Sequence, residues 1–136
     1  EVNFPTARAG RDNVLWVGDT LKFRVQKVDL GTRQFLAEFG DLGDTPGDLP
    51  RTKGLAVDGE GRIWISDGIL DVVSVFGAEG QFLASYGKGG EEPGEFGMPA
   101  GIAVDPKGRV AVADSLNGRV QILLRSVPAN GNGKRQ

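Results

Sequence analysis

Carboxylates recur at a nearly constant spacing along the chain. Asp19, Asp67 and Asp114 are separated by 48 and 47 residues, and Arg24 and Arg119 follow the first and third of them by five residues. A carboxylate beside a turn can accept backbone N–H bonds and pair with such a guanidinium group. A metal or catalytic site would need several carboxylates at one point. One carboxylate per repeat instead favours a structural role, and we expect no catalytic, metal-binding or cofactor-binding residue in this chain.

Two Gly-rich segments carry a second set of carboxylates. Residues 40–48 contain Asp41, Asp44 and Asp48, and residues 87–95 contain Glu91, Glu92 and Glu95. Oxygen ligands of this kind can bind Ca²⁺, but the spacing matches no calcium-loop pattern. Solvated loops are the simplest interpretation, and a polar interaction rim for another protein is the next. The segment Gly87-Lys88-Gly89-Gly90 is not a phosphate loop, because no Ser or Thr follows the Lys and no helix is expected there.

The composition excludes several classes of function. The 136 residues include no His and no Cys, so the usual ligands of Zn and haem and the common His and Cys catalytic groups are missing. The net charge of −2 gives no basic surface for nucleic acid. No apolar run has the roughly 20 residues needed to cross a bilayer, and the sequence begins without the features of a signal peptide. We expect neither nucleic-acid binding nor membrane insertion.

The positions of these residues follow from internal repeats. Seven of the fourteen residues in 54–67 are identical to those in 101–114, and three more exchange one branched aliphatic residue for another. Residues 15–19 are an earlier, more divergent copy of residues 63–67. The segment 34–40 likewise recurs as 81–87, whereas the third copy lacks it. A period of this length indicates a repeat architecture.

Each full repeat predicts four short antiparallel strands. In the middle repeat they lie near Leu55 to Val57, at Ile63 to Ser66, at Val72 to Phe76 and at Phe82 to Tyr86, separated by Gly, Pro and Asp turns. Four strands in about 47 residues are typical of a β-propeller blade. Trp16 and Trp64 hold the same register in successive repeats, so we expect both in the core between blades.

Residues 99–122 resemble an NHL repeat. The Pro-x-Gly-Ile-Ala-Val-Asp strand of that family matches residues 99–105, and its Ala-Asp-Thr-x-Asn-x-Arg-Val-Gln-Val strand is similar to residues 113–122. With its divergent copies, the resemblance covers residues 4 to about 125. The middle copy departs from the pattern, since Val72 stands where Arg24 and Arg119 stand in the others. The divergent copies and Gly-rich loops are most similar to bacterial members of the family.

The resemblance implies an all-β fold consisting of part of a propeller. We expect blades at about 4–48, 49–97 and 98–126, followed by a flexible polar tail at 127–136. NHL propellers usually have six blades, so this chain would supply about half a ring. Open blade faces are apolar and do not persist in water on a soluble monomer. We therefore expect self-association or another protein chain to complete the ring.

Three classes of function remain for such a fold. The first is a non-catalytic protein-interaction or scaffold module, an accessory subunit of a larger assembly, for which the family favours a periplasmic or extracellular location in a bacterium. The second is a propeller hydrolase or lyase fragment, which without His would need an all-carboxylate Ca²⁺ site. The third is RNA binding, which some members perform through a basic face, whereas the loops here are acidic. We expect the first.

Overall fold

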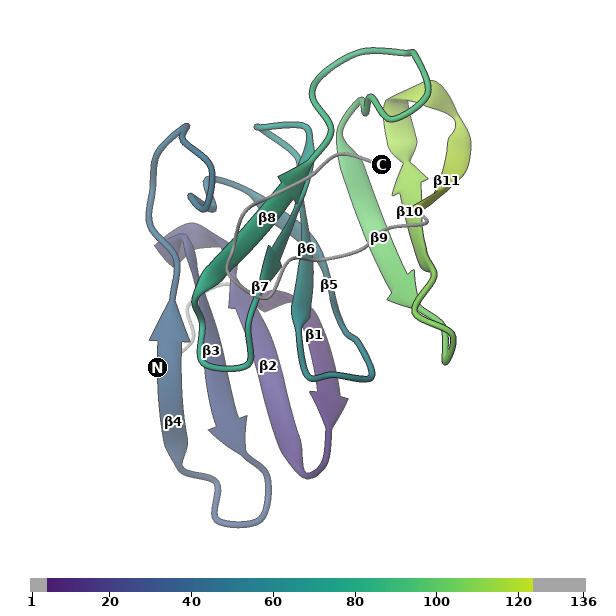
Figure 1. Cartoon of the computed structure of the whole chain (residues 1–136). Coiled ribbons are helices and arrows are strands. Elements are labelled where there is room, and N and C mark those ends of the chain that lie inside the picture. Colours follow the sequence, from purple (N-terminus) through teal and green to yellow (C-terminus); the bar gives the residue numbers. More distant parts are fainter. Residues whose placement is uncertain (1–4, 124–136) are drawn as a thin grey trace.

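The computed structural model describes residues 5–123, which form eleven strands in three antiparallel sheets (Figure 1). Blade 1 contains β1 (Pro5–Arg11), β2 (Val14–Asp19), β3 (Arg24–Asp29) and β4 (Phe35–Phe39). Blade 2 contains β5 (Thr52–Val57), β6 (Ile63–Asp67), β7 (Val72–Phe76) and β8 (Phe82–Tyr86). Blade 3 contains β9 (Pro99–Val104), β10 (Val110–Asp114) and β11 (Arg119–Leu123). Two short 3₁₀ turns, η1 (Thr20–Lys22) and η2 (Ser115–Asn117), follow β2 and β10.

The strands of each blade pair in sequence order, because tight turns join each strand to the next. The turn between β5 and β6 begins at Asp58, and that between β9 and β10 begins at Asp105. In both turns a Gly with positive φ, Gly61 or Gly108, occupies the conformation that only Gly adopts without strain. The predicted all-β fold with four-stranded antiparallel blades is confirmed for blades 1 and 2. Within the described residues, blade 3 has three strands, and the predicted tail at 127–136 lies outside them.

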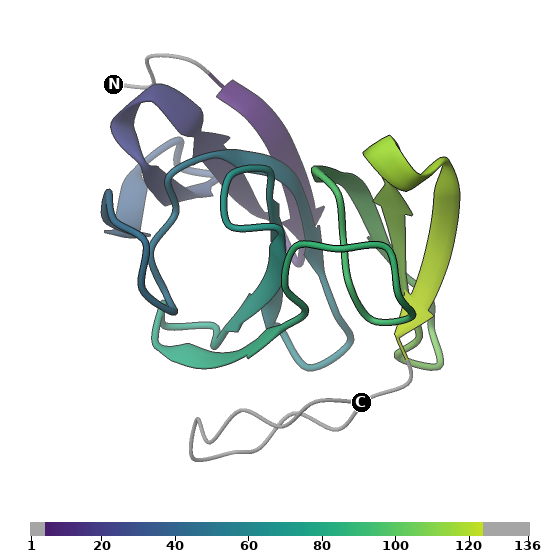
Figure 2. The same cartoon turned by 90° about the horizontal axis from the view of Figure 1, so that it is seen from above.

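The three blades are arranged side by side, as in a propeller. The first strands β1, β5 and β9 are neighbours, and the remaining strands of each blade extend away from them (Figures 1 and 2). Loops 40–51 and 87–98 join the blades at the end where β2, β6 and β10 finish. That common end is called the loop rim below. In the described part of the chain, no helix is long and apolar enough to span a membrane.

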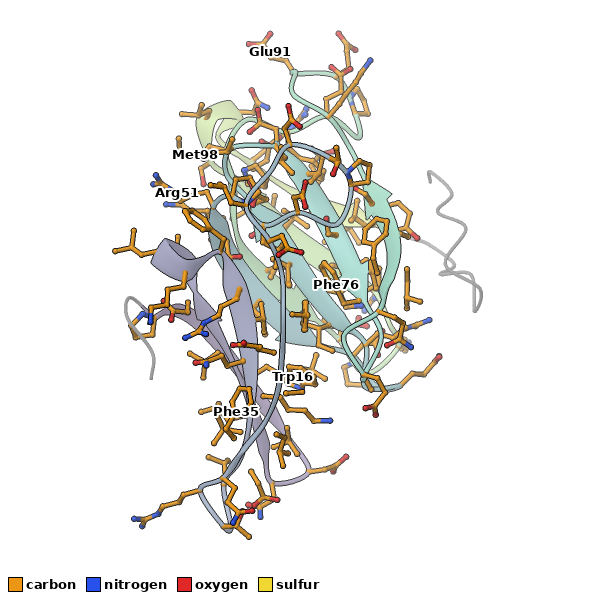
Figure 3. The ribbon with its side chains drawn as sticks, turned by 90° about the vertical axis from the view of Figure 1, so that its left-hand side faces the viewer. Trp16, Phe35, Arg51, Phe76, Glu91 and Met98 are labelled. Atoms are coloured by element: carbon orange, nitrogen blue, oxygen red, sulfur yellow. The ribbon has the colours of Figure 1, made fainter. Side chains whose placement is uncertain are left out.

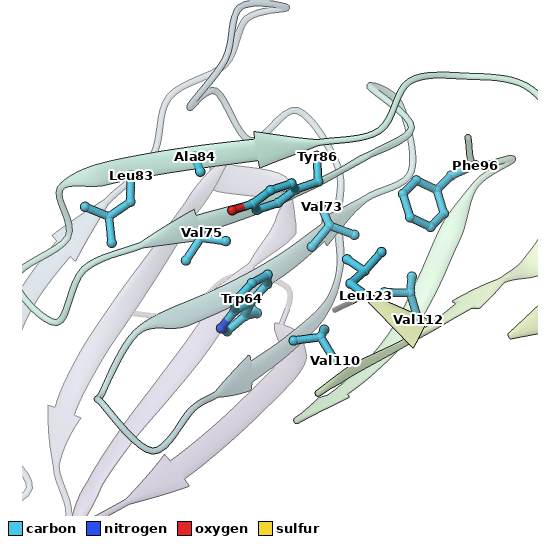
Figure 4. Close-up of a cluster of buried hydrophobic side chains, with 10 residues drawn as sticks. All are labelled: Trp64, Val73, Val75, Leu83, Ala84, Tyr86, Phe96, Val110, Val112 and Leu123. Atoms are coloured by element: carbon cyan, nitrogen blue, oxygen red, sulfur yellow. The ribbon is translucent and has the colours of Figure 1, made fainter. Parts of the chain in front are cut away.

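The hydrophobic core consists of two layers, one on each side of blade 2. Successive side chains of a strand point to opposite faces. Ile63 and Ile65 therefore pack toward blade 1, and Trp64 between them packs toward blade 3. The layer between blades 1 and 2 also includes Trp16 and Val25. The layer between blades 2 and 3 is shown in Figure 4 and contains Val73, Val75, Tyr86, Phe96, Val110, Val112 and Leu123.

Candidate interaction site

Asp67 is a fully buried carboxylate at the corner where β6 ends. One of its oxygens accepts the N–H groups of Ile69 and Leu70, both at 2.9 Å, and the other accepts the N–H of Arg51 at 2.8 Å. Arg51 lies 16 residues earlier, at the end of the loop that enters the blade. Asp67 therefore fastens the incoming loop to the corner after β6.

Asp114 occupies the same corner in blade 3 and is also fully buried. It accepts the N–H of Gly97 at 2.7 Å, the Arg119 Nε–H at 2.8 Å and the Gln121 amide at 3.0 Å, with Asn117 also in contact. Burial acts to raise the pKa of Asp114, but the hydrogen bonds from Gly97, Asn117, Arg119 and Gln121 outweigh it and hold the pKa below its usual value. The carboxylate is thus ionised near neutral pH and held by donors on every side.

The corner in blade 1 uses an ion pair. Asp19 is fully buried, and its Oδ2 lies 3.5 Å from Arg24 Nη2. Arg24 Nη1 also donates to Glu38 Oε2 at 2.7 Å. Asp19, Asp67 and Asp114 thus each serve their own sheet. The described residues contain no group of three or more His, Cys, Asp or Glu side chains placed to hold a metal ion.

Asp58 and Asp105 form a second pair of structural carboxylates, 47 residues apart. Their role as hydrogen-bond acceptors was not among the predictions from the sequence. Asp58 accepts the N–H of Glu60 and the Nε–H of Arg62, and its Oδ2 also accepts the indole N–H of Trp64 at 3.0 Å. Asp105 makes the corresponding bonds with Lys107 and Arg109. The signal was an Asp followed four residues later by Arg, both identical between the copies.

The acidic residues of the candidate interaction rim divide into two kinds. Asp48 accepts the N–H and the hydroxyl of Thr45, at 2.9 and 2.6 Å, and so shapes its own loop. Glu95 is mostly buried, accepts the Glu92 N–H at 3.2 Å, and lies 3.4 Å from Lys88 Nζ. The exposed members are Asp41, Asp44, Glu91 and Glu92. Figure 3 shows Glu91 at the far end of the molecule, beyond Met98 and Arg51.

The two tryptophans lie in the two core layers. Trp64 has no exposed surface and stacks on Tyr86 with ring centroids 6.0 Å apart. Trp16 packs edge-on to Phe39, and the Lys27 ammonium group lies 5.0 Å from the centre of its ring. Each tryptophan points from its own blade toward the next one in the sequence.

Blade 3 presents an apolar face on the side away from blade 2. Val120 and Ile122 are 66% and 55% exposed, whereas Val110, Val112 and Leu123 of the same sheet are buried against blade 2. Register places Ala111 opposite Ile122 and Ala113 opposite Val120, so these alanines belong to the same open face. Contiguous exposed apolar groups are common where proteins contact one another, so this face is a candidate interaction surface.

Blade 1 presents the corresponding face at the other end of the arc. Leu15 pairs with Val28, and Val28 with Phe35, so these residues share the side opposite Trp16. Figure 3 shows Trp16 and Phe35 on opposite sides of the sheet. Phe35 is 55% exposed, whereas its repeat partner Phe82 packs into the core between blades 1 and 2. The candidate site of this chain is therefore its pair of open blade faces.

Comparison with known proteins agrees with this architecture. Residues 96–123 match the NHL repeat family model. The fold is similar to regucalcin from Agrobacterium tumefaciens, a calcium-binding protein, with a TM-score of 0.66 and 20% identity over 93% of this chain and 47% of that one. It is similar to virginiamycin B lyase from Staphylococcus aureus (TM-score 0.66, 13% identity, 94% of this chain and 43% of that one).

Hydrazine synthase from Kuenenia stuttgartiensis gives a TM-score of 0.64 at 17% identity, over 93% of this chain and 37% of that one. No curated protein sequence matches the chain. This chain thus spans less than half the length of each of these propeller structures. At such identities the likeness concerns the fold. The chain carries an NHL repeat and has the fold of a partial, three-bladed β-propeller.

Proposed function

We propose that this chain is a non-catalytic protein-interaction module, an accessory subunit whose open blade faces dock on a protein. The observation that carries the proposal is the exposure of Val120 and Ile122, whose repeat partners Val73 and Val75 are fully buried against the next blade. The same pattern of residues that forms an internal interface in blade 2 therefore stands open in blade 3.

The physical chemistry of the open faces supports the same function. Burying apolar surface releases roughly 25 cal/mol for each Å² removed from water, so an open sheet face of branched aliphatic residues is stabilised when another apolar sheet covers it. The buried carboxylates at the corners fix the loops rigidly, and a rigid surface loses little entropy when it binds. The acidic loop rim with Asp41, Asp44 and Glu91 would then guide polar contacts around this apolar surface. An extracytoplasmic location in a bacterium belongs to the same proposal.

Photo-crosslinking in cells tests this function. A benzoylphenylalanine in place of Val120 should crosslink to a protein, because the open face would be covered there. The matched control carries the same group in place of Lys107, which is exposed in the turn before β10 and lies off the blade face. We expect a discrete crosslinked band from position 120 and none from position 107. No band from position 120, or the same bands from both positions, would overturn the proposal.

A further inference from the structure

The two open faces are the two halves of an interface that the molecule already forms internally. On blade 3, Val120 and Ile122 follow Val73 and Val75 by 47 residues and hold the same register against the second strand of their blade. Val73 and Val75 belong to the core layer in which blade 2 meets blade 3. The open face of blade 3 therefore carries the residues that correspond to those with which blade 2 packs against blade 3.

Blade 1 has the opposite half. Leu15, Val17 and Val28 precede Ile63, Ile65 and Phe76 by 48 residues, and Phe35 precedes Phe82 by 47. The four residues of blade 2 face blade 1 in the other core layer. The open face of blade 1 therefore carries the residues that correspond to those with which blade 2 packs against blade 1.

We propose that the occupant of these faces is a second copy of this chain, arranged head to tail. Blade 3 of one copy packs against blade 1 of the other, and the reverse contact forms at the same time. This inference rests on the proposed function, because it names the partner of the interaction module. A twofold axis then relates the copies, while each contact joins two different faces.

The length of the arc fits this closure. One copy spans 47% of the regucalcin chain and 43% of the lyase chain, so two copies approximate one complete propeller of that kind. Closing the ring forms two contacts together, and the second contact forms within an already associated pair at high effective concentration. Closure also removes both exposed apolar faces from water.

The closing contact differs from the internal interfaces in two of its side chains. Trp16 and Trp64 supply a large ring to each internal interface, whereas blade 3 has Ala111 at that position. An aromatic ring in the closing contact comes from Phe35 of blade 1, in the way that Phe82 supplies one to the interface between blades 1 and 2. Ser66, which donates to the Ala100 carbonyl across the internal interface, is replaced by Ala113. The open face of blade 3 thus buries no hydroxyl that would need a partner.

The particle mass of the full chain in solution tests the proposal. Sedimentation equilibrium should give twice the 14.4 kDa of one chain. Ile122→Asp and Phe35→Asp should each halve the measured mass, because an apolar contact cannot bury an unpaired carboxylate without opposing the association. Both residues are exposed in the single chain, so circular dichroism should show an unchanged fold.

Leu116→Asp is the matched control. Leu116 is 72% exposed, and its repeat partner Ile69 remains 55% exposed although blade 2 has a neighbour on each side. This position therefore lies outside the blade faces. Leu116→Asp should leave the mass at that of two chains.

A mixture of the Ile122→Asp and Phe35→Asp variants distinguishes head-to-tail pairing from other arrangements. The mixed pair retains one intact contact, between blade 3 of the Phe35→Asp chain and blade 1 of the Ile122→Asp chain. Mixing should therefore recover pairs that neither variant forms alone. Pairing of two blade 3 faces, or of two β11 edges, would instead leave Phe35→Asp associated, and that result would overturn the proposal.

The crosslinking at position 120 separates this inference from the proposed function. If the native chain is a monomer and crosslinks only to a different protein, the proposed pairing of two copies is overturned and the proposed interaction function is retained. A crosslink between two copies, together with the doubled mass, supports both. A monomer without any crosslink overturns both.

Discussion

Strands β6 and β10 hold the same position in successive repeats but have different surroundings. All five residues of β6 are buried, whereas β10 alternates between buried and half-buried positions. The alternation arises because blade 2 has a blade on each side and blade 3 has one only within the described residues. Burial in this fold is therefore set by how many sheets flank a strand.

The corner carboxylates of the same two blades also differ, in the groups that donate hydrogen bonds to them. Asp67 in the fully flanked blade accepts three backbone N–H groups, whereas Asp114 in the open blade is held by one backbone N–H and by the side chains of Asn117, Arg119 and Gln121. Val72 takes the place of Arg119 in blade 2. The corner carboxylate thus holds the loop rim in both blades, by different donors, and the open face distinguishes blade 3.

Trp64→Ala should lower the free energy of unfolding the most, because Trp64 is the large side chain of β6 in the core layer between blades 2 and 3. Trp64 has no exposed surface, stacks on Tyr86 and donates its indole N–H to Asp58. We expect the free energy of unfolding to fall by about 3–5 kcal/mol, from lost burial and the cavity left behind. The midpoint of urea unfolding measures it. Trp64→Phe, which keeps a ring but loses the hydrogen bond, should cost less, and a loss under about 1 kcal/mol for Trp64→Ala would contradict the packing.

Asp114→Asn should have the next largest effect. The Arg119 guanidinium and the Gly97 N–H lose a charged acceptor, but Asn keeps one acceptor oxygen. Hydrogen bonds to charged groups contribute about 1.5–3 kcal/mol, so we expect a loss of about 2–3 kcal/mol. Because the pKa of Asp114 is lowered in the folded chain, its contribution to stability is present above pH about 4. It is lost as the pH falls through the lowered value.

The acid limb of unfolding measures this contribution. The Asp114→Asn variant should lose less stability than the native chain between neutral pH and the acid range, because Asn does not titrate. Glu91→Gln removes one exposed carboxylate and changes the net charge by the same amount, so it serves as the control for altered net charge. Equal acid dependence of Asp114→Asn and the native chain would show that Asp114 does not stabilise the folded form through its charge.

The regular parts of the fold could be predicted from the sequence. The predicted strands Val72 to Phe76 and Phe82 to Tyr86 coincide with β7 and β8. Predicted Ile63 to Ser66 falls one residue short of β6, and the strand near Leu55 to Val57 begins three residues earlier, at Thr52. Alternating apolar residues and turn residues determine these elements locally, and the repeat supplies each prediction twice.

The contacts between repeats could not be predicted in the same way. The Ser66 hydroxyl donates to the Ala100 carbonyl, and the Met98 N–H bonds to Asp71 across 27 residues. These bonds depend on how far each blade is rotated from the next, which the spacing along the chain does not specify. The backbone conformation at Asp71 could not be predicted either. Its φ of 55° is close to that of Phe23 and Gly118 at the equivalent repeat positions, although the three residues are of different types.

Val75→Ala and Ile122→Ala give the smallest effect and the closest comparison, because the two residues hold the same register in blades 2 and 3. Val75 has no exposed surface, and its truncation should cost about 2 kcal/mol through lost burial and a cavity. Ile122 is 55% exposed, so truncation in the single chain should change the free energy of unfolding by no more than about 0.5 kcal/mol. Urea unfolding in dilute solution, where an associated pair separates, measures both values. At high protein concentration, Ile122→Ala should lower the free energy of unfolding by more than it does in dilute solution. The reason is that Ile122 then lies in the proposed contact between two copies. A cost for Ile122→Ala that equals that of Val75→Ala in dilute solution would show that the face of blade 3 is covered within one chain.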